Sequence, residues 1–290
     1  MANLLARLGL WTPLNLDPLV HARASSRRHA MRLTSAGAAV QSRYATASPR
    51  VSVSGSSAAR WQRTPRRFAA REISEDHVRP HDMPVTLFGS RGSGSAAVEM
   101  ALRAASVDYE LVRASSWEAD SAFGQLLELN PLGQIPTLRL DDGTVLTESV
   151  AILLYLALEH PESGLLPVAS IERAIDIRGL VYIAANCYPA VSVSDFPEQW
   201  TTATTKSARA RVRQAARAQL HRKWDIFADV FGTRLRPAEP GALAFLAVVV
   251  SQWSGTRQHL EAERPAFYET LLQLEAHGRL AATLREHREA

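Results

Sequence analysis

The stretch Asn130–Ser149, NPLGQIPTLRLDDGTVLTES, constrains the fold more than any other part of the sequence. Ile135-Pro136 precedes a short apolar run, and X-Pro is the peptide bond that adopts the cis form at low cost, usually in a tight turn. Two short extended runs, Thr137–Leu140 and Thr144–Leu146, flank Asp141–Gly143, and Asp-Gly is a strong hairpin signal. We therefore expect a proline turn followed directly by a β-hairpin.

An apolar helix is expected directly after the hairpin. Val150–Leu158 is apolar almost throughout, and Thr147-Glu148-Ser149 stands just before it. We expect Thr147 or Ser149 to cap this helix, and the free N–H groups of its first turn to form an anion site. An extended peptide could then pair with the backbone at Ile135 and place a carboxylate at Ser149. The residues alone equally allow an ordinary hairpin followed by a capped helix.

The chain upstream of this stretch alternates between strand and helix patterns. A strand, helix and strand of the observed lengths imply a right-handed parallel crossover. With the hairpin and the helix after it, the order becomes βαβαββα, which is typical of a thioredoxin-like α/β domain. The upstream elements are expected at Val85–Phe88 (strand), Ala96–Ala105 (helix), Tyr109–Arg113 (strand) and Trp117–Leu129 (helix).

The chain downstream is predicted to be helical. Glu159–Pro167 has the Pro and Gly content of a linker, and beyond it apolar residues recur at helical spacing. Gly241–Trp253 is apolar nearly all round, which predicts a central buried helix. Further helices are expected at Ser170–Tyr188, Lys206–Phe231, Pro265–His277 and Leu280–His287.

The motif Asn-Pro-x-Gly-Gln-Ile-Pro-Thr-Leu, the Asp-Gly hairpin and Thr-Glu-Ser before an apolar helix resemble the bacterial-type glutathione S-transferase family. The resemblance is specific over residues 130–149 and extends more weakly over Pro84–Leu284. It implies a thioredoxin-like N-terminal domain followed by an all-α helical-bundle C-terminal domain, and it implies a homodimer.

The resemblance also assigns roles to residues of the hairpin region. It implies that the backbone of Ile135, ahead of a cis Pro136, pairs with the cysteinyl part of glutathione, with Gln134 beside it. It implies that Glu148 and Ser149 hold the γ-glutamyl end. Glutathione is then the co-substrate.

The turn Gly89–Ser95 is the expected position of the group that activates the thiol. A thiol becomes a nucleophile as its pKa falls, and a helix N-terminus or a nearby donor lowers it. This turn leads into the helix expected at 96–105 and offers three serines. We expect Ser93 to stabilise the thiolate, with Ser90 and Ser95 as the next candidates; the alternative is that these serines only cap the helix.

The sequence departs from the family at two positions of this turn. Counted back from the helix, the activating serine position falls on Gly92 and the cysteine position of the β-class enzymes on Gly94, and no tyrosine stands near the strand end. The departure keeps open a non-catalytic binding protein on the same fold.

Two further groups are weaker candidates. By resemblance, Tyr182, Cys187, Tyr188 and Trp200 lie where transferases place the hydrophobic co-substrate; the alternative is core packing. Arg209, Arg213 and Arg217 form a row at four-residue spacing, which is typical of a solvated face and less often of an anion contact.

Composition argues against several classes of protein. A single cysteine excludes an internal disulfide and fits a reducing compartment, and nine histidines show no metal-ligand spacing. Residues 1–71 hold twelve arginines, no lysine and one acidic residue, so the remainder of a chain with net charge +4 is acidic and favours no nucleic-acid surface. The longest apolar run, Ala242–Val250, is shorter than the ~20 residues of a membrane helix. We expect a cytoplasmic protein with no metal, no nucleic acid and no membrane.

Three regions follow from these patterns. Residues 1–82, rich in Arg, Ser and Ala, are expected to be a disordered basic extension. A mitochondrial transit peptide, a genuine basic tail and translation from Met83 remain alternatives for it. The thioredoxin-like glutathione-binding domain is expected at 83–162 and the all-helical domain at 168–290.

The predicted function is that of a detoxifying glutathione S-transferase, which transfers the glutathione thiolate to a small hydrophobic electrophile. Two alternatives share the fold and the site. One is the non-catalytic glutathione- or partner-binding protein, and the other is a glutathione-dependent lyase, etherase or dehalogenase.

Overall fold

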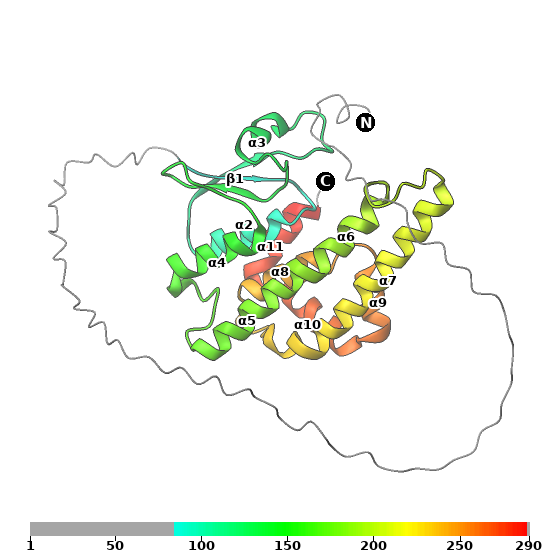
Figure 1. The fold of residues 1–290 in the computed structure, drawn as a ribbon. Helices are drawn as coiled ribbons and strands as arrows, with labels where there is room; N and C mark the ends of the chain where they lie inside the picture. The colour runs from blue at the N-terminus through cyan, green and yellow to red at the C-terminus, as the bar shows by residue number, and fades with distance from the viewer. Residues whose placement is uncertain (1–83, 289–290) are drawn as a thin grey trace, which may run out of the picture. The chain divides into compact units, whose positions relative to one another are not determined.

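The computed structural model describes residues 84–288 (Figure 1). The extension predicted at 1–82 lies outside the described residues. Within the described range an α/β layer comes first and helices follow, as the sequence predicts.

Four strands form the sheet, in the spatial order β2-β1-β3-β4. β1 (Val85–Gly89) pairs in parallel with β2 (Tyr109–Arg113) and antiparallel with β3 (Thr137–Arg139), and β3 pairs antiparallel with β4 (Val145–Leu146). Gly143 closes the β3–β4 hairpin at φ +85°, a conformation that a residue without Cβ adopts readily. The predicted strands and the hairpin are confirmed.

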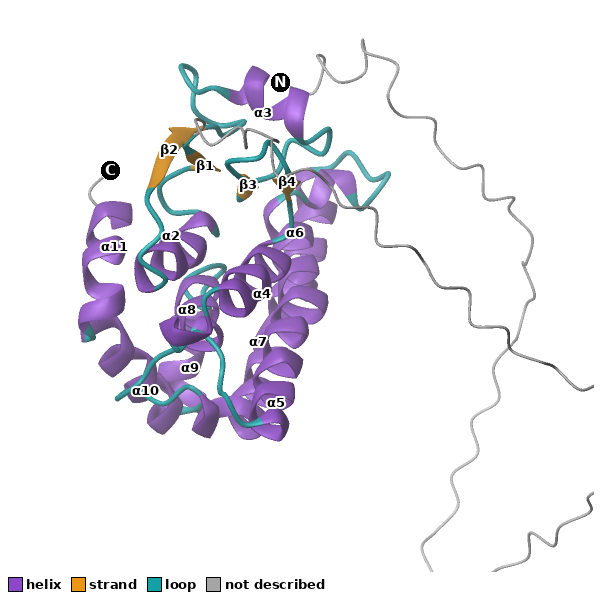
Figure 2. Cartoon of the chain, turned by 90° about the vertical axis from the view of Figure 1, so that its left-hand side faces the viewer, coloured by secondary structure: helices purple, strands orange, loops and turns teal. Residues whose placement is uncertain are grey.

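Helices cover both faces of this sheet (Figures 1 and 2). α2 (Ser95–Ala104) and α4 (Ser149–Glu159) lie on one face, and α3 (Phe123–Leu129) lies on the other. The alternation of side chains along β1 explains this arrangement. Leu87 belongs to the main core with α2 and α4, whereas Phe88 points the opposite way into a small cluster with α3.

The helix predicted at Trp117–Leu129 is shorter than expected, because α3 begins only at Phe123. The Ala122 N–H donates to the carbonyl of Arg113 at the end of β2, at 2.8 Å, and this bond holds the preceding segment out of a helix. Trp117 consequently lies in a loop and is largely exposed.

The helix predicted at Ser170–Tyr188 is interrupted. α5 (Ser170–Tyr182) passes into a π-helical segment, Ile183–Cys187, before α6 (Tyr188–Asp195). Pro189 follows the π-helical segment, and proline has no N–H to donate to the preceding turn, which explains why regular α-helical bonding fails here. Such wide turns are frequent at functional sites.

The next two helices form the middle of the helical part. α7 (Lys206–Phe231) has the predicted bounds, and α8 (Ala242–Val250) is shorter than predicted but buried at every residue. The N–H of Ala242 donates to the carbonyl of Leu165 in the linker, at 2.9 Å. A Cβ at Gly241 would lie 2.5 Å from the same oxygen, so the glycine permits the linker to close over the start of α8.

Three helices complete the described chain. α9 (Thr256–Glu263) was not predicted, whereas α10 (Pro265–Ala276) and α11 (Gly278–Arg288) correspond to predicted helices. α11 returns to lie beside α2, where Arg103 and Glu286 form an ion pair with two hydrogen bonds of 2.6 and 3.2 Å (Figure 1).

One hydrophobic core runs from Leu87 in the sheet through α2 and α4 into the buried helix α8. The boundaries predicted at 83–162 and 168–290 therefore stay predictions. Within residues 84–288, no helix is long and apolar enough to cross a membrane, and no group of three or more His, Cys, Asp or Glu side chains is placed to hold a metal ion.

Candidate functional site

The proline turn has the conformation that the sequence predicts, because the Ile135–Pro136 peptide bond is cis. Buried Asn130 holds the turn: its Nδ2 donates to the Gln134 carbonyl and to Thr137 Oγ1, both at 3.0 Å. Thr137 Oγ1 donates to the same carbonyl at 2.9 Å. Asn130 opens the motif quoted above, but its role in holding the turn was not predicted, because no local pattern shows which groups its amide bonds.

Ile135 presents a free stretch of backbone at this edge. Among the described residues, neither its N–H nor its carbonyl is hydrogen-bonded. Its side chain is half-buried and packs against the small cluster of Phe88 and Leu126, which fixes the residue in place. A free donor and acceptor on a fixed edge is what an added peptide strand requires.

Glu148 has a rare backbone conformation at the beginning of α4, with φ +64° and ψ +111°. For a residue other than glycine this conformation costs on the order of 1–3 kcal/mol, and such residues cluster at binding sites. The expectation that Thr147 or Ser149 caps the helix is wrong, because Glu148 occupies the cap position and no side chain caps it. Ser149 is the first helical residue, and its Oγ turns towards Tyr188 instead.

The three serines expected to activate the thiol are all buried and bond mainly to one another and to acidic residues. Ser93 Oγ donates to the Ser90 carbonyl at 2.7 Å and lies 3.0 Å from Ser95 Oγ. Ser90 Oγ donates to Glu118 Oε1 at 2.7 Å, and Ser95 Oγ donates to Glu99 Oε1 or the Ser90 carbonyl, each at 3.3 Å. A hydroxyl has one proton, so each of these protons already faces an oxygen within the protein. The roles of these serines as activators stay predictions.

Long-range contacts hold the glycine turn from two sides. Gly92, at φ +69°, donates its N–H to His287 Nδ1 at 3.1 Å, and its carbonyl accepts from Trp253 Nε1 at 3.3 Å. The same histidine lies 2.8 Å from Glu99 Oε1 through Nε2, and both side chains are buried. Because Nδ1 accepts a hydrogen bond from the Gly92 N–H, Nε2 carries the imidazole hydrogen and donates a hydrogen bond to the Glu99 carboxylate. The sequence did not predict the two partners of Gly92, because Trp253 and His287 lie 161 and 195 residues away from it along the chain.

Tyr188 reaches this region from the first turn of α6. Its Oη accepts a hydrogen bond of 3.4 Å from Ser149 Oγ, and it lies 3.0 Å from the position that a Cβ at Gly94 would occupy. Its ring packs against Trp253 with the centroids 5.8 Å apart. Burial raises the pKa of this hydroxyl to about 12.

The other aromatic and thiol candidates lie elsewhere. Tyr182 donates from its hydroxyl to the Lys223 carbonyl and packs on Phe231, so it belongs to the core. Cys187 is fully buried, and burial raises the pKa of its thiol to about 12. Trp200 is exposed. Of the four residues, the structure brings only Tyr188 to the region of the cis-proline edge and the start of α2.

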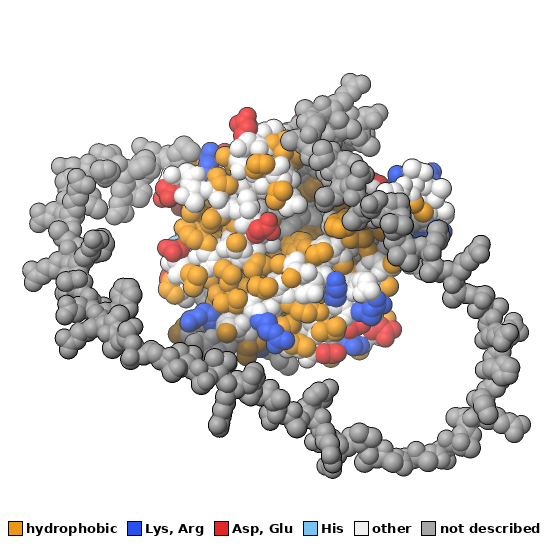
Figure 3. All heavy atoms as spheres, in the orientation of Figure 1, with side chains coloured by type: hydrophobic (Ala, Val, Ile, Leu, Met, Phe, Trp, Pro, Cys, Tyr) orange, Lys and Arg blue, Asp and Glu red, His pale blue; other side chains and the backbone are white. Residues whose placement is uncertain are grey.

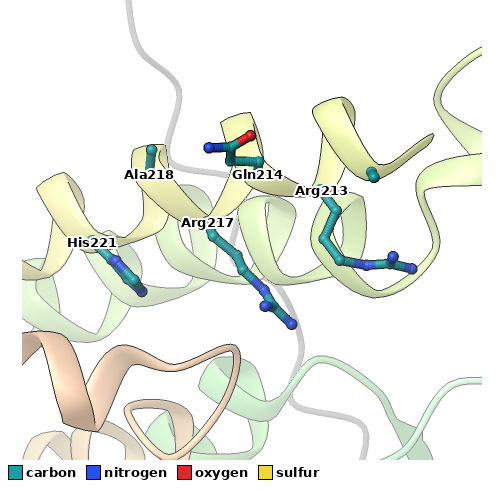
Figure 4. Close-up of a pocket in the computed structure, with 6 residues that line it drawn as sticks. Arg213, Gln214, Arg217, Ala218 and His221 are labelled. Atoms are coloured by element: carbon teal, nitrogen blue, oxygen red, sulfur yellow. The ribbon is translucent and has the colours of Figure 1, made fainter. Parts of the chain in front are cut away.

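The arginine row lies on α7, where two of its members bind the end of α6 (Figure 4). Arg213 Nε donates to the Ser194 carbonyl at 2.9 Å and Arg217 Nε to Ser194 Oγ at 3.2 Å. Cations at a helix C-terminus are favoured by the helix dipole. A hollow of about 350 Å³ beside them is lined by Ala210, Arg213, Gln214, Arg217, Ala218 and His221. Packing against the end of α6 therefore explains Arg213 and Arg217.

Comparisons with known proteins agree with this geometry. Residues 83–158 match the family model "Glutathione S-transferase, N-terminal domain". The uncharacterized GST-like protein YncG of Escherichia coli K12 is 37% identical over 117 residues, which are 40% of this chain and 57% of that protein. GstA of Escherichia coli O157:H7 is 37% identical over 142 residues, 47% of this chain and 65% of that protein. The chain thus spans under two thirds of the length of these curated relatives.

Solved structures extend the likeness to the helical part. A glutathione transferase homolog from Sulfitobacter, with bound glutathione, has a TM-score of 0.59 at 25% identity, covering 70% of this chain and 98% of that one. A sphingomonad glutathione S-transferase complexed with glutathione has a TM-score of 0.54 at 25% identity, covering 71% and 100%.

The sheet order, the cis-proline edge and the helices after them define a thioredoxin-like domain followed by an all-helical part. With the family match and these likenesses, the class becomes more specific: residues 83–158 match the N-terminal domain of glutathione S-transferases, and the chain is similar to bacterial-type glutathione S-transferases.

Proposed function

We propose that this protein binds glutathione and transfers its thiolate sulfur to a small hydrophobic electrophile. The proposal is carried by two unusual backbone features. One is the N–H and carbonyl of Ile135, to which no described residue is hydrogen-bonded, and the other is the positive φ of Glu148 at the uncapped start of α4. The two lie one hairpin apart, and solved relatives with bound glutathione have the same fold.

The geometry suits the two ends of a short acidic peptide. The cysteinyl backbone of glutathione would pair with Ile135 as an added strand, flanked by Gln134 and Pro136. The γ-glutamyl carboxylate would lie at Ser149, where the first-turn N–H groups and the dipole of α4 favour an anion. The Glu148 carboxylate would bind the γ-glutamyl ammonium.

The thiol end would then lie near the start of α2, whose dipole favours the thiolate. In the reaction the thiol proton leaves to solvent and the sulfur attacks an electrophilic carbon. With an aryl halide, a C–S bond forms and the carbon–halogen bond breaks, and the halide leaves with the bonding electron pair. The protein would supply position and electrostatic stabilisation of the sulfur anion.

Calorimetric titration with glutathione tests the binding proposal. Glu148→Ala should weaken binding about 10- to 100-fold, because one charged hydrogen bond is lost. Glu159→Ala is the matched control, since it removes an exposed carboxylate from the other end of the same helix and should leave binding unchanged. Equal binding by wild type and Glu148→Ala, or no heat with the wild type, would contradict the proposal.

A different glutathione-dependent reaction is the second candidate. A probable maleylacetoacetate isomerase of Caenorhabditis elegans is 41% identical over 91 residues, which cover 31% of this chain and 42% of that protein. Two observations favour a non-catalytic role. The serine hydroxyls already donate hydrogen bonds within the protein, and glycine stands at positions 92 and 94. Turnover assays with an activated aryl halide and with a cis-olefinic diketo acid separate these functions, since a pure binding protein turns over neither.

A homodimer and a cytoplasmic location complete the proposal. Large apolar side chains are exposed near the end of α4 and the start of α5, and Figure 3 shows apolar groups over this face. They are Leu158, Val168 and Ile171. Exposed apolar patches of this kind often mark contacts between protein chains. Light scattering on the purified chain would give twice the monomer mass if this proposal holds and the monomer mass if it does not.

A further inference from the structure

The turn before α2 lacks a hydroxyl that is free to bind a thiolate. Glycine occupies both positions where the resemblance implies an activating side chain, Gly92 and Gly94. The hydroxyl protons of Ser90, Ser93 and Ser95 face oxygens of the protein at 2.7 to 3.3 Å. A hydroxyl donor that adds to the dipole of α2 must therefore come from another part of the chain.

The space left by Gly94 is the meeting point of three side chains. A Cβ placed there would lie 3.0 Å from Tyr188 Oη, 3.7 Å from the ring of Trp253 and 3.8 Å from Cδ of Pro136. Pro136 is the cis proline of the peptide-binding edge. The Tyr188 hydroxyl thus lies where the start of α2, the cis proline and Ser149 converge, and the missing side chain at position 94 is what admits it.

The hydroxyl of Tyr188 is a donor whose proton is not already used. In its contact with Ser149, the serine Oγ donates and Tyr188 Oη accepts. Tyr188 donates its own proton to no other group among the described residues. Its ring packs against Trp253, and the indole N–H of Trp253 donates to the Gly92 carbonyl. The same tryptophan therefore positions both the Tyr188 hydroxyl and the turn.

We propose that Tyr188, from the first turn of α6, donates the hydrogen bond that stabilises the thiolate of bound glutathione. The assignment rests on the proposed function, because it requires glutathione to lie along the Ile135 edge. Burial raises the pKa of this phenol to about 12, so the group stays protonated at neutral pH and acts as a hydrogen-bond donor, not as a base. The thiol proton leaves to solvent, and the tyrosine keeps its own.

Titration of the thiol in the bound state tests the assignment. The ultraviolet absorbance of the thiolate is followed against pH in the glutathione complexes of wild type and Tyr188→Phe. The variant should bind glutathione in calorimetry, and its bound thiol should have a pKa higher by about one unit, which is a tenfold loss of thiolate near neutral pH. Turnover of an activated aryl halide should fall about tenfold at neutral pH, and by less at alkaline pH, where the thiol ionises without help.

Tyr182→Phe is the matched control, because it removes a tyrosine hydroxyl from the same helical stretch that bonds only the Lys223 carbonyl. It should leave the thiol titration unchanged. Gly94→Ala is a second variant: its methyl group would lie 3.0 Å from Tyr188 Oη, so the hydroxyl must shift slightly, and the variant should raise the thiol pKa by less than Tyr188→Phe does. An unchanged thiol pKa in Tyr188→Phe with glutathione bound would overturn the assignment alone. Absence of glutathione binding by the wild type would instead overturn the function on which it rests.

Discussion

The cis-proline edge and the turn before α2 differ in how their polar groups are used. At the edge, no residue that the structure describes bonds the backbone groups of Ile135, and Glu148 is held in a rare conformation. At the turn, the serine hydroxyls and both polar groups of Gly92 are bonded within the protein. The edge therefore offers polar groups that a ligand could use, whereas the polar groups of the turn hold the turn in its conformation.

This difference implies two separable tasks. The edge would set the affinity for glutathione, and the region around the turn would set the reactivity of its sulfur. Substitutions that change one region and leave the other intact test whether affinity and reactivity depend on separate regions.

Asn130→Ala should have the largest effect. It removes the buried Asn130 amide, so that the Gln134 carbonyl keeps only its bond from Thr137 Oγ1 and the Leu132 N–H loses its partner, and it should lower the free energy of unfolding by about 2–3 kcal/mol. Urea unfolding measures the loss, and glutathione affinity should fall with it. Asn186→Ala is the control, because that amide makes one half-buried bond, to the Tyr182 carbonyl, and should cost about 1 kcal/mol or less. Equal losses would show that Asn130 does not organise the edge.

His287→Ala should have the next largest effect, on the turn. It leaves the Gly92 N–H without its partner and removes the 2.8 Å bond of the buried Glu99 carboxylate, which keeps only the longer contact with Ser95 Oγ, and this should cost about 2 kcal/mol in urea unfolding. Turnover should fall more than glutathione affinity, since the edge is untouched. The neighbouring Glu286→Ala breaks only an exposed pair with Arg103 and should cost below about 1 kcal/mol. A parallel loss of affinity and turnover in His287→Ala would contradict the separation of tasks.

Replacing Glu148 by glycine and by alanine should give the smallest difference in stability. Both variants lose the carboxylate and should lose glutathione affinity equally. Only glycine relieves the positive φ, so Glu148→Gly should be more stable than Glu148→Ala by about 1 kcal/mol. Thermal unfolding of the two variants measures this difference. Lower stability of the glycine variant would show that the backbone of Glu148 is not strained.

The edge could be predicted from the sequence because its determinants are local. Pro136, the Asp-Gly hairpin and the start of α4 lie within twenty residues, and each has a turn or cap signal of its own. The exception was the cap of α4: Thr147 and Ser149 are good cap residues, but the chain places Glu148 there in a conformation that no propensity favours.

The turn could not be predicted in the same way. Its shape depends on Trp253, in the turn between α8 and α9, and on His287 in α11, and the two follow no spacing rule. The serines suggested activation because hydroxyl groups precede a helix, yet burial directs their protons inward. The break between α5 and α6 was missed for a related reason, since the apolar stripe of Ser170–Tyr188 continues through the π-helical segment.

A crystal structure of the protein with glutathione tests the central claim most directly. We expect the cysteinyl N–H and carbonyl to pair with the backbone of Ile135 and the γ-glutamyl carboxylate to lie at Ser149. We expect the sulfur to lie within hydrogen-bond distance of Tyr188 Oη. Glutathione bound elsewhere, or with its backbone unpaired at Ile135, would contradict it.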